Sequence, residues 1–93
     1  MKLTWDETKQ KITLANRGLD FAWASQIAGV FEYIIEDTRF DYGEKRYISL
    51  GDINGRLCVV VWTPRDGGRH IISMRKANDR EQKYYGVWAR SQR

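Results

Sequence analysis

The sequence contains few of the residue types that hold metals or cross-link a chain, with one cysteine, one histidine and one proline in 93 residues. A single cysteine excludes an internal disulfide and suits a reducing compartment. One histidine and one cysteine do not supply the usual zinc ligand sets, and no carboxylate cluster has metal-loop spacing. We therefore expect no metal and no cofactor. Cys58 lies in the apolar run 57–62, which predicts a buried, unreactive thiol.

Long hydrophobic runs are also lacking, since no apolar stretch approaches the roughly 20 residues of a membrane span. The first residues, 1–6, lack the apolar segment of a signal peptide. Both absences predict a soluble, cytoplasmic protein. Hydrophobic residues nevertheless make up 42% of the chain and aromatic residues 13%. This composition predicts one folded domain over residues 1–93.

Negative charge is outnumbered, with 12 Asp and Glu against 16 Lys and Arg and a net charge of +4. The excess of positive charge favours an anionic partner such as RNA, DNA or an acidic protein. The region from Arg65 onward is the richest in arginine. A basic nucleic-acid-binding module without catalysis is one function that this composition allows.

Capping residues and apolar periodicity predict three helices. Asp6 and Asp20 are placed to accept hydrogen bonds from the first amides of two helices, and Gly18 suits a left-handed C-cap between them. Asn78, followed three residues later by Glu81, resembles a capping box. Helices are therefore expected over residues 7–16, 21–28 and 79–89.

Alternating apolar side chains and turn residues predict an antiparallel meander. Asn54–Gly55 favours a two-residue type I′ turn, so the strands on either side of it should pair antiparallel. Together with the helices this predicts an α+β domain, with the helices packed on one side of the sheet. Strands are expected over residues 30–36, 46–53, 56–63 and 69–75, with a turn over 64–68 and a short strand or lead-in over 3–5.

The segment 69–77 begins as a strand and ends in a basic run. Successive side chains of a strand point to opposite faces. Arginines and a hydroxyl on a buried face need an anionic or polar partner, which argues for a binding site. The alternative is an edge strand whose arginines are solvated. Strict alternation predicts that Arg69, Ile71, Ser73 and Arg75 share one face, and that His70, Ile72 and Met74 share the other.

The available side chains suit cleavage of RNA without a metal. Arginine forks match phosphate oxygens two at a time, and tyrosines can stack on bases or donate a proton. Cleavage needs a base for the ribose 2′-hydroxyl, cations for the phosphorane charge and an acid for the leaving 5′-oxygen. Glu44 is the carboxylate best placed as base, with His70 and the tyrosines as other candidates. The alternative for Glu44 and Arg46 is a surface ion pair. A Ser-His-Asp arrangement that uses Ser73 and His70 is not expected, because strict alternation points the two side chains to opposite faces of one strand.

Several sequence blocks occur in an order and spacing that are specific when taken together. The blocks are segments 5–9 with 16–21, 41–51, 60–63, and 71–77 through Glu81 to Tyr84 and Tyr85. The first two resemble W-D-x-x-K followed by K-H-G-[VI]-x-F, and the third resembles D-Y-G-E-x-R-x-x-x-x-G. The last two resemble a V-V-Y-T strand and a closing I-I-S-A-R-K-A…E…Y block. In these blocks the chain resembles the BrnT toxins, small ribonucleases of type II toxin–antitoxin systems.

This resemblance implies a fold like that of RelE toxins, with two N-terminal helices, a four-stranded antiparallel meander and a C-terminal helix. It also implies metal-independent RNA cleavage that inhibits translation and arrests growth. The implied partner is a BrnA-like antitoxin with a ribbon-helix-helix DNA-binding domain, so that the complex represses its own operon. The implied catalytic residues are Glu44, Arg46, Ser73, Arg75 and Tyr84, and the implied substrate-binding residues are Lys9, Arg17, Arg69, His70, Lys76 and Arg80.

The chain departs from the family pattern at two positions. Arg17 stands where the family has the histidine of K-H-G, and His70 stands where an arginine usually precedes I-I-S. If Arg17 and His70 face each other in the fold, the two groups have exchanged places. If they do not, the alternative is a weakened nuclease that still binds antitoxin.

Overall fold

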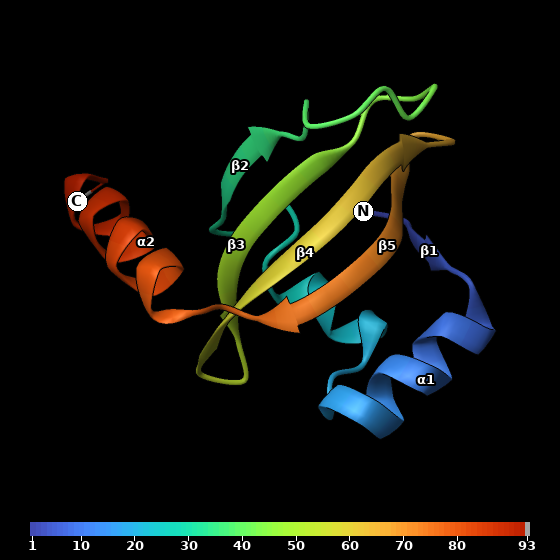
Figure 1. Cartoon of the computed structure of the whole chain (residues 1–93), viewed down its shortest axis with the longest axis horizontal. Helices are drawn as coiled ribbons and strands as arrows, with labels where there is room; N and C mark the ends of the chain where they lie inside the picture. Colours follow the sequence, from blue (N-terminus) through green and yellow to red (C-terminus); the bar gives the residue numbers. More distant parts are fainter. Residues whose placement is uncertain (93) are drawn as a thin grey trace.

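The structure, a computed structural model, describes residues 1–92, and its strands form a single five-stranded sheet in the order β1-β5-β4-β3-β2. Figure 1 shows α1 and α2 at opposite ends of this sheet. Within residues 1–92 no helix has the length and apolar character needed to span a membrane. The elements are β1 (Leu3–Trp5), α1 (Glu7–Arg17), the 3-10 helix η1 (Phe21–Gln26), β2 (Tyr33–Glu36), β3 (Tyr47–Ile53), β4 (Arg56–Arg65), β5 (Gly68–Lys76) and α2 (Asp79–Ser91).

The predicted meander is confirmed, because β2, β3, β4 and β5 are neighbours in the sheet and pair antiparallel. Asn54 and Gly55 have φ of 52° and 77°, as a type I′ turn requires. The turn between β4 and β5 is shorter than expected, because Asp66 and Gly67 also have positive φ and make a second tight turn.

The prediction of four strands was one short, because β1 adds a fifth strand that runs parallel to β5. The two backbones come close at Gly68, where a Cβ atom would lie 2.2 Å from the carbonyl oxygen of Lys2. Arg69 N donates a hydrogen bond of 2.9 Å to this oxygen. A three-residue strand has too little periodicity to be distinguished from a lead-in, and Gly68 gives it the space to pair.

The helix predictions are confirmed at the two ends of the chain and wrong in kind for the middle helix. Asp6 accepts from Lys9 N at the start of α1, and the Asn78–Glu81 capping box begins α2. Residues 21–28 were expected to form an α-helix, but only Phe21–Gln26 is helical and it is a 3-10 helix. The Asp20 side chain accepts from Ala22 N and its carbonyl accepts from Trp23 N, which favours the tighter turn.

One face of the sheet is covered by the segment 19–27, and we call it the closed face. Its sheet residues include Cys58, Val60, Trp62, Ile71 and Met74, which pack against Leu19, Phe21, Ala24 and Ile27. Cys58 is fully buried and burial raises the pKa of its thiol, as expected for an unreactive cysteine. Gly51 allows close packing here, because a Cβ atom would lie 2.5 Å from Ile27 Cγ2.

The opposite face, which we call the open face, is only partly covered by α2. Tyr85 and the half-buried Trp88 of α2 pack against Leu50, Leu57 and Val59 of the sheet. The prediction that all helices lie on one side was therefore wrong. The α2 helix has its own apolar stripe and covers the open face at one end, which leaves the rest of that face to solvent.

A β-bulge in β5 decides which of its side chains reach the open face. Val61 pairs with Ser73, but the next residue of β4, Trp62, pairs with Ile71, so β5 carries Ile72 as an extra residue. The bulge breaks strict alternation. Ile71 and Met74 both reach the closed face, whereas His70 pairs with Thr63 and lies on the same face as Ser73. The expected grouping of Arg69 and Ile71 with Ser73 and Arg75 was therefore wrong.

Candidate active site

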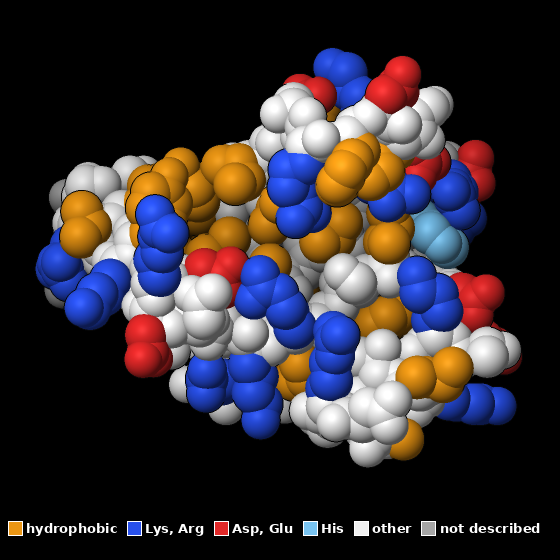
Figure 2. Space-filling view, in the orientation of Figure 1, with side chains coloured by type: hydrophobic (Ala, Val, Ile, Leu, Met, Phe, Trp, Pro, Cys, Tyr) orange, Lys and Arg blue, Asp and Glu red, His pale blue; other side chains and the backbone are white. Residues whose placement is uncertain are grey.

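The open face holds a cavity of about 320 Å³ between α2, the sheet and the loop after β2. Its floor is apolar and comes from three neighbouring strands. Figure 2 shows hydrophobic side chains between the basic groups of this face. The floor residues are Ile35, Ile48, Leu50, Val59 and Val61, and the polar lining residues are Arg39, Ser73, Arg75, Glu81 and Tyr84.

Arg75 is held at the cavity by Glu81. Its Nη1 and Nη2 atoms each donate a 2.8 Å hydrogen bond to one carboxylate oxygen, so the pair uses both prongs of the guanidinium. The hydrogen bonds from Arg75 lower the pKa of Glu81, and Glu81 raises that of Arg75. Glu81 also accepts from Asn78 N in the capping box, which fixes its position at the start of α2. The sequence predicted this cap but not the pairing with Arg75.

Arg39 is a second cavity arginine that the sequence prediction missed. Its Nε and Nη2 atoms donate to the two carboxylate oxygens of Asp37 at 2.8 and 2.9 Å. Tyr42 Oη donates to the same carboxylate, and Arg39 holds the pKa of Asp37 well below its usual range. Arg39 and Arg75 line the same cavity, which therefore has two guanidinium groups in its wall. An acidic residue two positions before an arginine was the signal in the sequence, but it also fits an ordinary loop.

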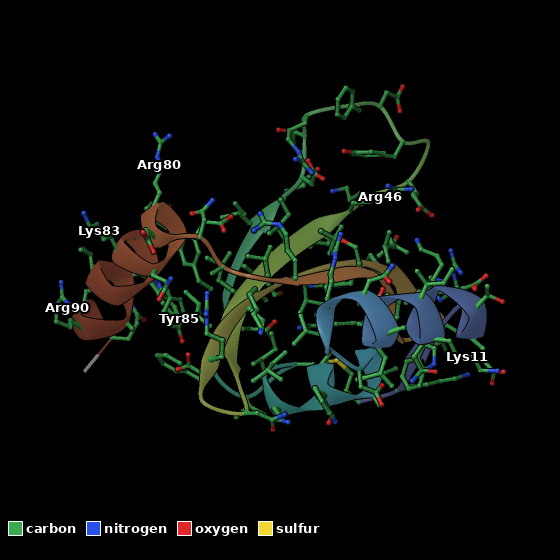
Figure 3. All side chains as sticks on the ribbon, turned by 60° about the horizontal axis from the view of Figure 1, so that its bottom comes forward. Lys11, Arg46, Arg80, Lys83, Tyr85 and Arg90 are labelled. Carbon is green, nitrogen blue, oxygen red and sulfur yellow. The ribbon has the colours of Figure 1, made fainter. Side chains whose placement is uncertain are left out.

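A second group of charged residues lies at the other end of the open face. Glu44 Oε2 lies 3.3 Å from Arg46 Nε, and its Oε1 lies 3.7 Å from Arg65 Nη2. The Arg46 guanidinium stacks on the Tyr42 ring, with its central carbon 4.1 Å from the ring centroid. Figure 3 shows Arg46 beside the loop that joins β2 to β3. Arg46 comes directly before Tyr47, whose ring stacks on Trp62 on the closed face, so alternation directs Arg46 to the open face.

His70 lies near this charged group. Thr63, the partner of His70 in β4, donates a hydrogen bond from Oγ1 to the carbonyl oxygen of Lys45. This bond connects the segment just before β3 to the part of the sheet that holds His70. The Nδ1 atom of His70 is 2.9 Å from Thr4 Oγ1 of β1. Burial, followed by the charge of Arg65, lowers the pKa of His70, so the imidazole is neutral at neutral pH. Because the bulge puts His70 and Ser73 on one face, the geometric reason given against pairing them does not hold, although no hydrogen bond joins them within residues 1–92.

Arg69 is not part of this face. It points to the closed face, where its two Nη atoms bond both oxygens of Glu32 at 2.6 and 2.9 Å. Its guanidinium also stacks on the Trp62 ring at 3.9 Å. Ser49 donates to the same carboxylate, and Trp62 donates to Ser49. Both Nη atoms of Arg69 and both oxygens of Glu32 are thus engaged within the protein, and Arg69 does not line the cavity, so its predicted role in substrate binding gains no support.

Four other predicted substrate-binding residues lie apart from the cavity. Lys76 pairs with Cys58 and so belongs to the closed face. Arg80 points from α2 away from the sheet, as do Lys83 and Arg90 (Figure 3). Lys9, on α1, is close enough to His70 to affect its pKa. Arg17 Nη1 donates to the carbonyl oxygen of Met74, at a point on β5 that β1 does not cover.

The exchange proposed for Arg17 and His70 has no support in the structure. Arg17 bonds the backbone at Met74, whereas His70 bonds Thr4 at the other end of β5. Four residues along a strand separate these contacts, or roughly 13 Å. Each side chain therefore has its own partner and its own place, and the imidazole has not simply moved across a shared site.

Metal chemistry has no candidate ligand set in the part of the chain that the structure describes. No group of three His, Cys, Asp or Glu side chains there is arranged to hold a metal ion. The side chains that meet on the open face are instead guanidinium, carboxylate, imidazole, hydroxyl and phenol groups. This set can bind phosphate and transfer protons.

Comparisons with known proteins identify the family of this chain. Residues 5–81 match the family described as "Ribonuclease toxin, BrnT, of type II toxin-antitoxin system". The crystal structure of the ribonuclease toxin BrnT from Brucella abortus matches with a TM-score of 0.68 and 31% identity, over 85% of this chain and 99% of that one. A comparison with curated proteins gives no match. The chain therefore belongs to the BrnT family of ribonuclease toxins of type II toxin–antitoxin systems.

Proposed function

We propose that this chain is an endoribonuclease that cleaves RNA without a metal, by attack of the ribose 2′-hydroxyl on the neighbouring phosphate. The observation that carries the proposal is the gathering of Arg46, His70, Ser73 and Arg75 on one face of the sheet, with Glu44 paired to Arg46. Basic groups on opposite faces could not hold one phosphodiester. Membership of a family of ribonuclease toxins supports the choice of RNA.

In the proposed step, His70 Nε2 takes the proton of the 2′-hydroxyl. The 2′-oxygen then bonds to phosphorus, and the bond from phosphorus to the 5′-oxygen breaks. Arg46 and Arg75 stabilise the added negative charge on the phosphorane. Water supplies the proton for the leaving 5′-oxygen, because the hydroxyl of the predicted acid Tyr84 is hydrogen bonded to that of Tyr33 at 2.6 Å, at the cavity end of the face and away from His70. The products are a 2′,3′-cyclic phosphate and a 5′-hydroxyl end.

His70 is preferred to Glu44 as the base for two reasons. Its lowered pKa keeps the imidazole neutral at neutral pH, and its Nδ1 atom is already held by Thr4. A neutral imidazole oriented through one nitrogen can accept a proton at the other. Glu44 instead has a guanidinium near each of its oxygens and suits the orientation of Arg46.

The experiment is to incubate the purified full-length chain with RNA in the presence of EDTA. Cutting that yields 2′,3′-cyclic phosphate ends is expected, because all the groups required belong to the protein or to water. Cutting that stops with EDTA and returns with a divalent ion would overturn the metal-free mechanism. 5′-phosphate ends would overturn attack by the 2′-hydroxyl.

In the cell, the proposed enzyme inhibits translation and arrests growth until an antitoxin binds it. Membership of a type II family implies such a partner. We propose a BrnA-like antitoxin with a ribbon-helix-helix domain, so that the chain contacts DNA only through the complex that represses its own operon. Co-expression with the protein encoded beside this chain should relieve growth arrest. Pull-down and operator-binding assays would test the complex.

A catalytically weakened toxin that only binds antitoxin is the second candidate. One observation favours it: Arg17 replaces the family's histidine and is bound to the Met74 carbonyl oxygen, so no imidazole occupies that position. This reading predicts tight antitoxin binding with no growth arrest on expression. It fails if the purified chain cuts RNA with many turnovers.

A further inference from the structure

The apolar floor of the cavity is the part of the open face that α2 does not cover. Cross-strand pairing joins Ile35 to Ile48 and Ile48 to Val61, which makes one apolar row across three strands. Ile35 is 40% exposed, although it lies in a sheet next to a core. Adjacent Ile34 is 41% exposed but points to the opposite face. The row therefore offers apolar surface within a walled cavity.

The ring of Tyr84 forms a fixed wall beside this floor. Its centroid lies 5.3 Å from that of Tyr33 in an edge-to-face arrangement, and the two hydroxyl groups are hydrogen bonded. Tyr33 is in turn packed against Trp88 of α2 at 5.1 Å. An aromatic ring fixed through both its edge and its hydroxyl group needs little reordering when a flat ligand stacks on it.

The rim carries a guanidinium group with one edge still available. Asp37 holds Nε and Nη2 of Arg39, whereas Nη1 has no hydrogen-bond partner among residues 1–92. The carboxylate fixes the plane of the group, so the remaining edge has a defined direction. The Arg39 side chain is 65% exposed, which leaves this edge accessible to a phosphate.

We propose that the cavity binds one nucleotide of the RNA substrate, with its base on the Ile48–Val61 floor against Tyr84 and its phosphate at Arg39. This subsite rests on the proposed function for the identity of the polymer. A base has apolar faces and a polar edge, which match the floor and the Ser73 and Glu81 side chains beside it. The volume of about 320 Å³ lies at the small end of ligand pockets and suits a single nucleotide.

A protein segment is the other occupant that an apolar cavity could take. The arginine rim and the small, walled volume favour the nucleotide, because a docking helix or strand needs a longer apolar groove. The two occupants also differ in what they should do to the floor. A stacked base shifts the methyl resonances of Ile48 and Val61 through its ring current, and inorganic phosphate should not.

The test uses two neighbouring substitutions in the full-length chain, Ile35→Glu and Ile34→Glu. Ile35 lines the cavity and Ile34 does not, although their exposure is nearly equal. Nucleoside 3′-monophosphates are titrated into each variant and followed by methyl NMR, with inorganic phosphate as the second probe. Wild type and Ile34→Glu should bind alike, and Ile35→Glu should bind at least tenfold more weakly.

A second pair of variants controls for the possibility that Ile35→Glu disturbs the folding of β2. Val61→Phe fills the cavity from the centre of the sheet, and Val30→Phe makes the same change at a residue that is 73% exposed and outside the cavity. Val61→Phe should also raise KM for RNA at least tenfold, while Val30→Phe leaves it unchanged. Equal nucleotide binding within either pair would overturn the subsite. Floor resonances that move with antitoxin and with no nucleotide would overturn it as well.

The two proposals fail in different ways. Nucleotide binding that depends on Ile35, in a chain that cuts no RNA, keeps the subsite and removes the nuclease. RNA cutting by Val61→Phe at the wild-type kcat/KM keeps the nuclease and removes the subsite.

Discussion

The two faces of the sheet each hold an arginine in a two-bond pair with a glutamate, and the faces use these pairs differently. On the closed face, Arg69 and Glu32 have side chains that are only 10% and 6% exposed. On the open face, Arg75 and Glu81 have nearly the same geometry but are 46% and 25% exposed, and both line a cavity.

Exposure, and not pairing, separates the structural arginine from the candidate catalytic one. If the buried Arg69 lost its carboxylate, no other anion could reach the guanidinium to compensate its charge. We therefore expect the Arg69–Glu32 pair to remain formed in the folded protein. In the exposed pair, a phosphate can take the place of the carboxylate with little change in solvation. The following predictions test this difference, starting with the largest effect.

Arg69→Met should lower the free energy of unfolding by about 3–5 kcal/mol, because it leaves the Glu32 carboxylate buried without its cation. Arg75→Met is the matched control and should cost no more than about 1 kcal/mol, because Glu81 remains accessible to water. Urea denaturation measures both. Equal losses would mean that burial does not distinguish the two faces.

A double variant sharpens the same comparison. Adding Glu32→Leu to Arg69→Met removes the orphaned charge and should recover part of the stability, since an apolar pair tolerates burial. Ser49 would lose one acceptor, so recovery should be incomplete. A double variant less stable than Arg69→Met alone would contradict this account.

Arg69 should matter more than Arg75 for stability, but Arg75 should matter more than Arg69 for RNA cleavage. Arg75→Ala should lower kcat/KM for RNA cleavage by about 100-fold or more, in line with loss of a preorganised transition-state donor. Arg75→Lys should recover only part of it, because an ammonium group lacks the guanidinium fork. Fluorogenic RNA provides the assay, with thermal unfolding to verify the fold. Wild-type turnover by Arg75→Ala would refute its assigned role.

Low pH should reduce the free energy of unfolding through protonation of Glu32, and a Glu32 variant separates this contribution from those of other carboxylates. Burial alone would raise the pKa of Glu32, but hydrogen bonds from Arg69, Gly29 N and Ser49 outweigh it and lower the pKa below 4.5. A depressed folded-state pKa gives stability that is present above the unfolded-state value and is lost as pH falls through the folded-state value. Wild-type stability should therefore fall below about pH 4.5 more steeply than that of Glu32→Gln. Identical slopes by urea denaturation would refute it.

Most of the fold could be predicted from local signals in the sequence. Asp6, Gly18, Asn78 and the Asn54–Gly55 turn act through their own backbone neighbourhoods, and each lies where the sequence placed it. The β1 strand was left open because its pairing depends on Gly68, which is far away in the sequence. A three-residue strand acquires its identity only from the partner.

The site was harder to predict because one extra residue in β5 changes which of its side chains share a face of the sheet. Alternation grouped Arg69 with Arg75, and the bulge at Ile72 separates them. Nothing local marks a bulge in a run of two isoleucines. Arg39 and Glu81 were missed as site residues for a related reason: each satisfies a local role, in a loop or a cap, while its side chain also reaches the cavity.

The smallest predicted effects concern the pH dependence of cleavage. Burial, then the charge of Arg65, lowers the pKa of His70, and Glu44 acts in the opposite direction. A base works when deprotonated, so the rate should fall as pH drops through a value below 6.5. Arg65→Gln should move this acid limb to higher pH, and Glu44→Gln should move it to lower pH. Steady-state rates across pH 4–8 measure both shifts.

This pair of variants also identifies the base. If His70 takes the 2′-hydroxyl proton, Glu44→Gln keeps a measurable rate and only shifts the limb. If Glu44 is the base, the same change removes the acid limb together with most of the activity, and His70→Gln leaves the limb in place. Because both residues lie in one charged group on the open face, the direction of the shift distinguishes them more clearly than the size of a rate loss.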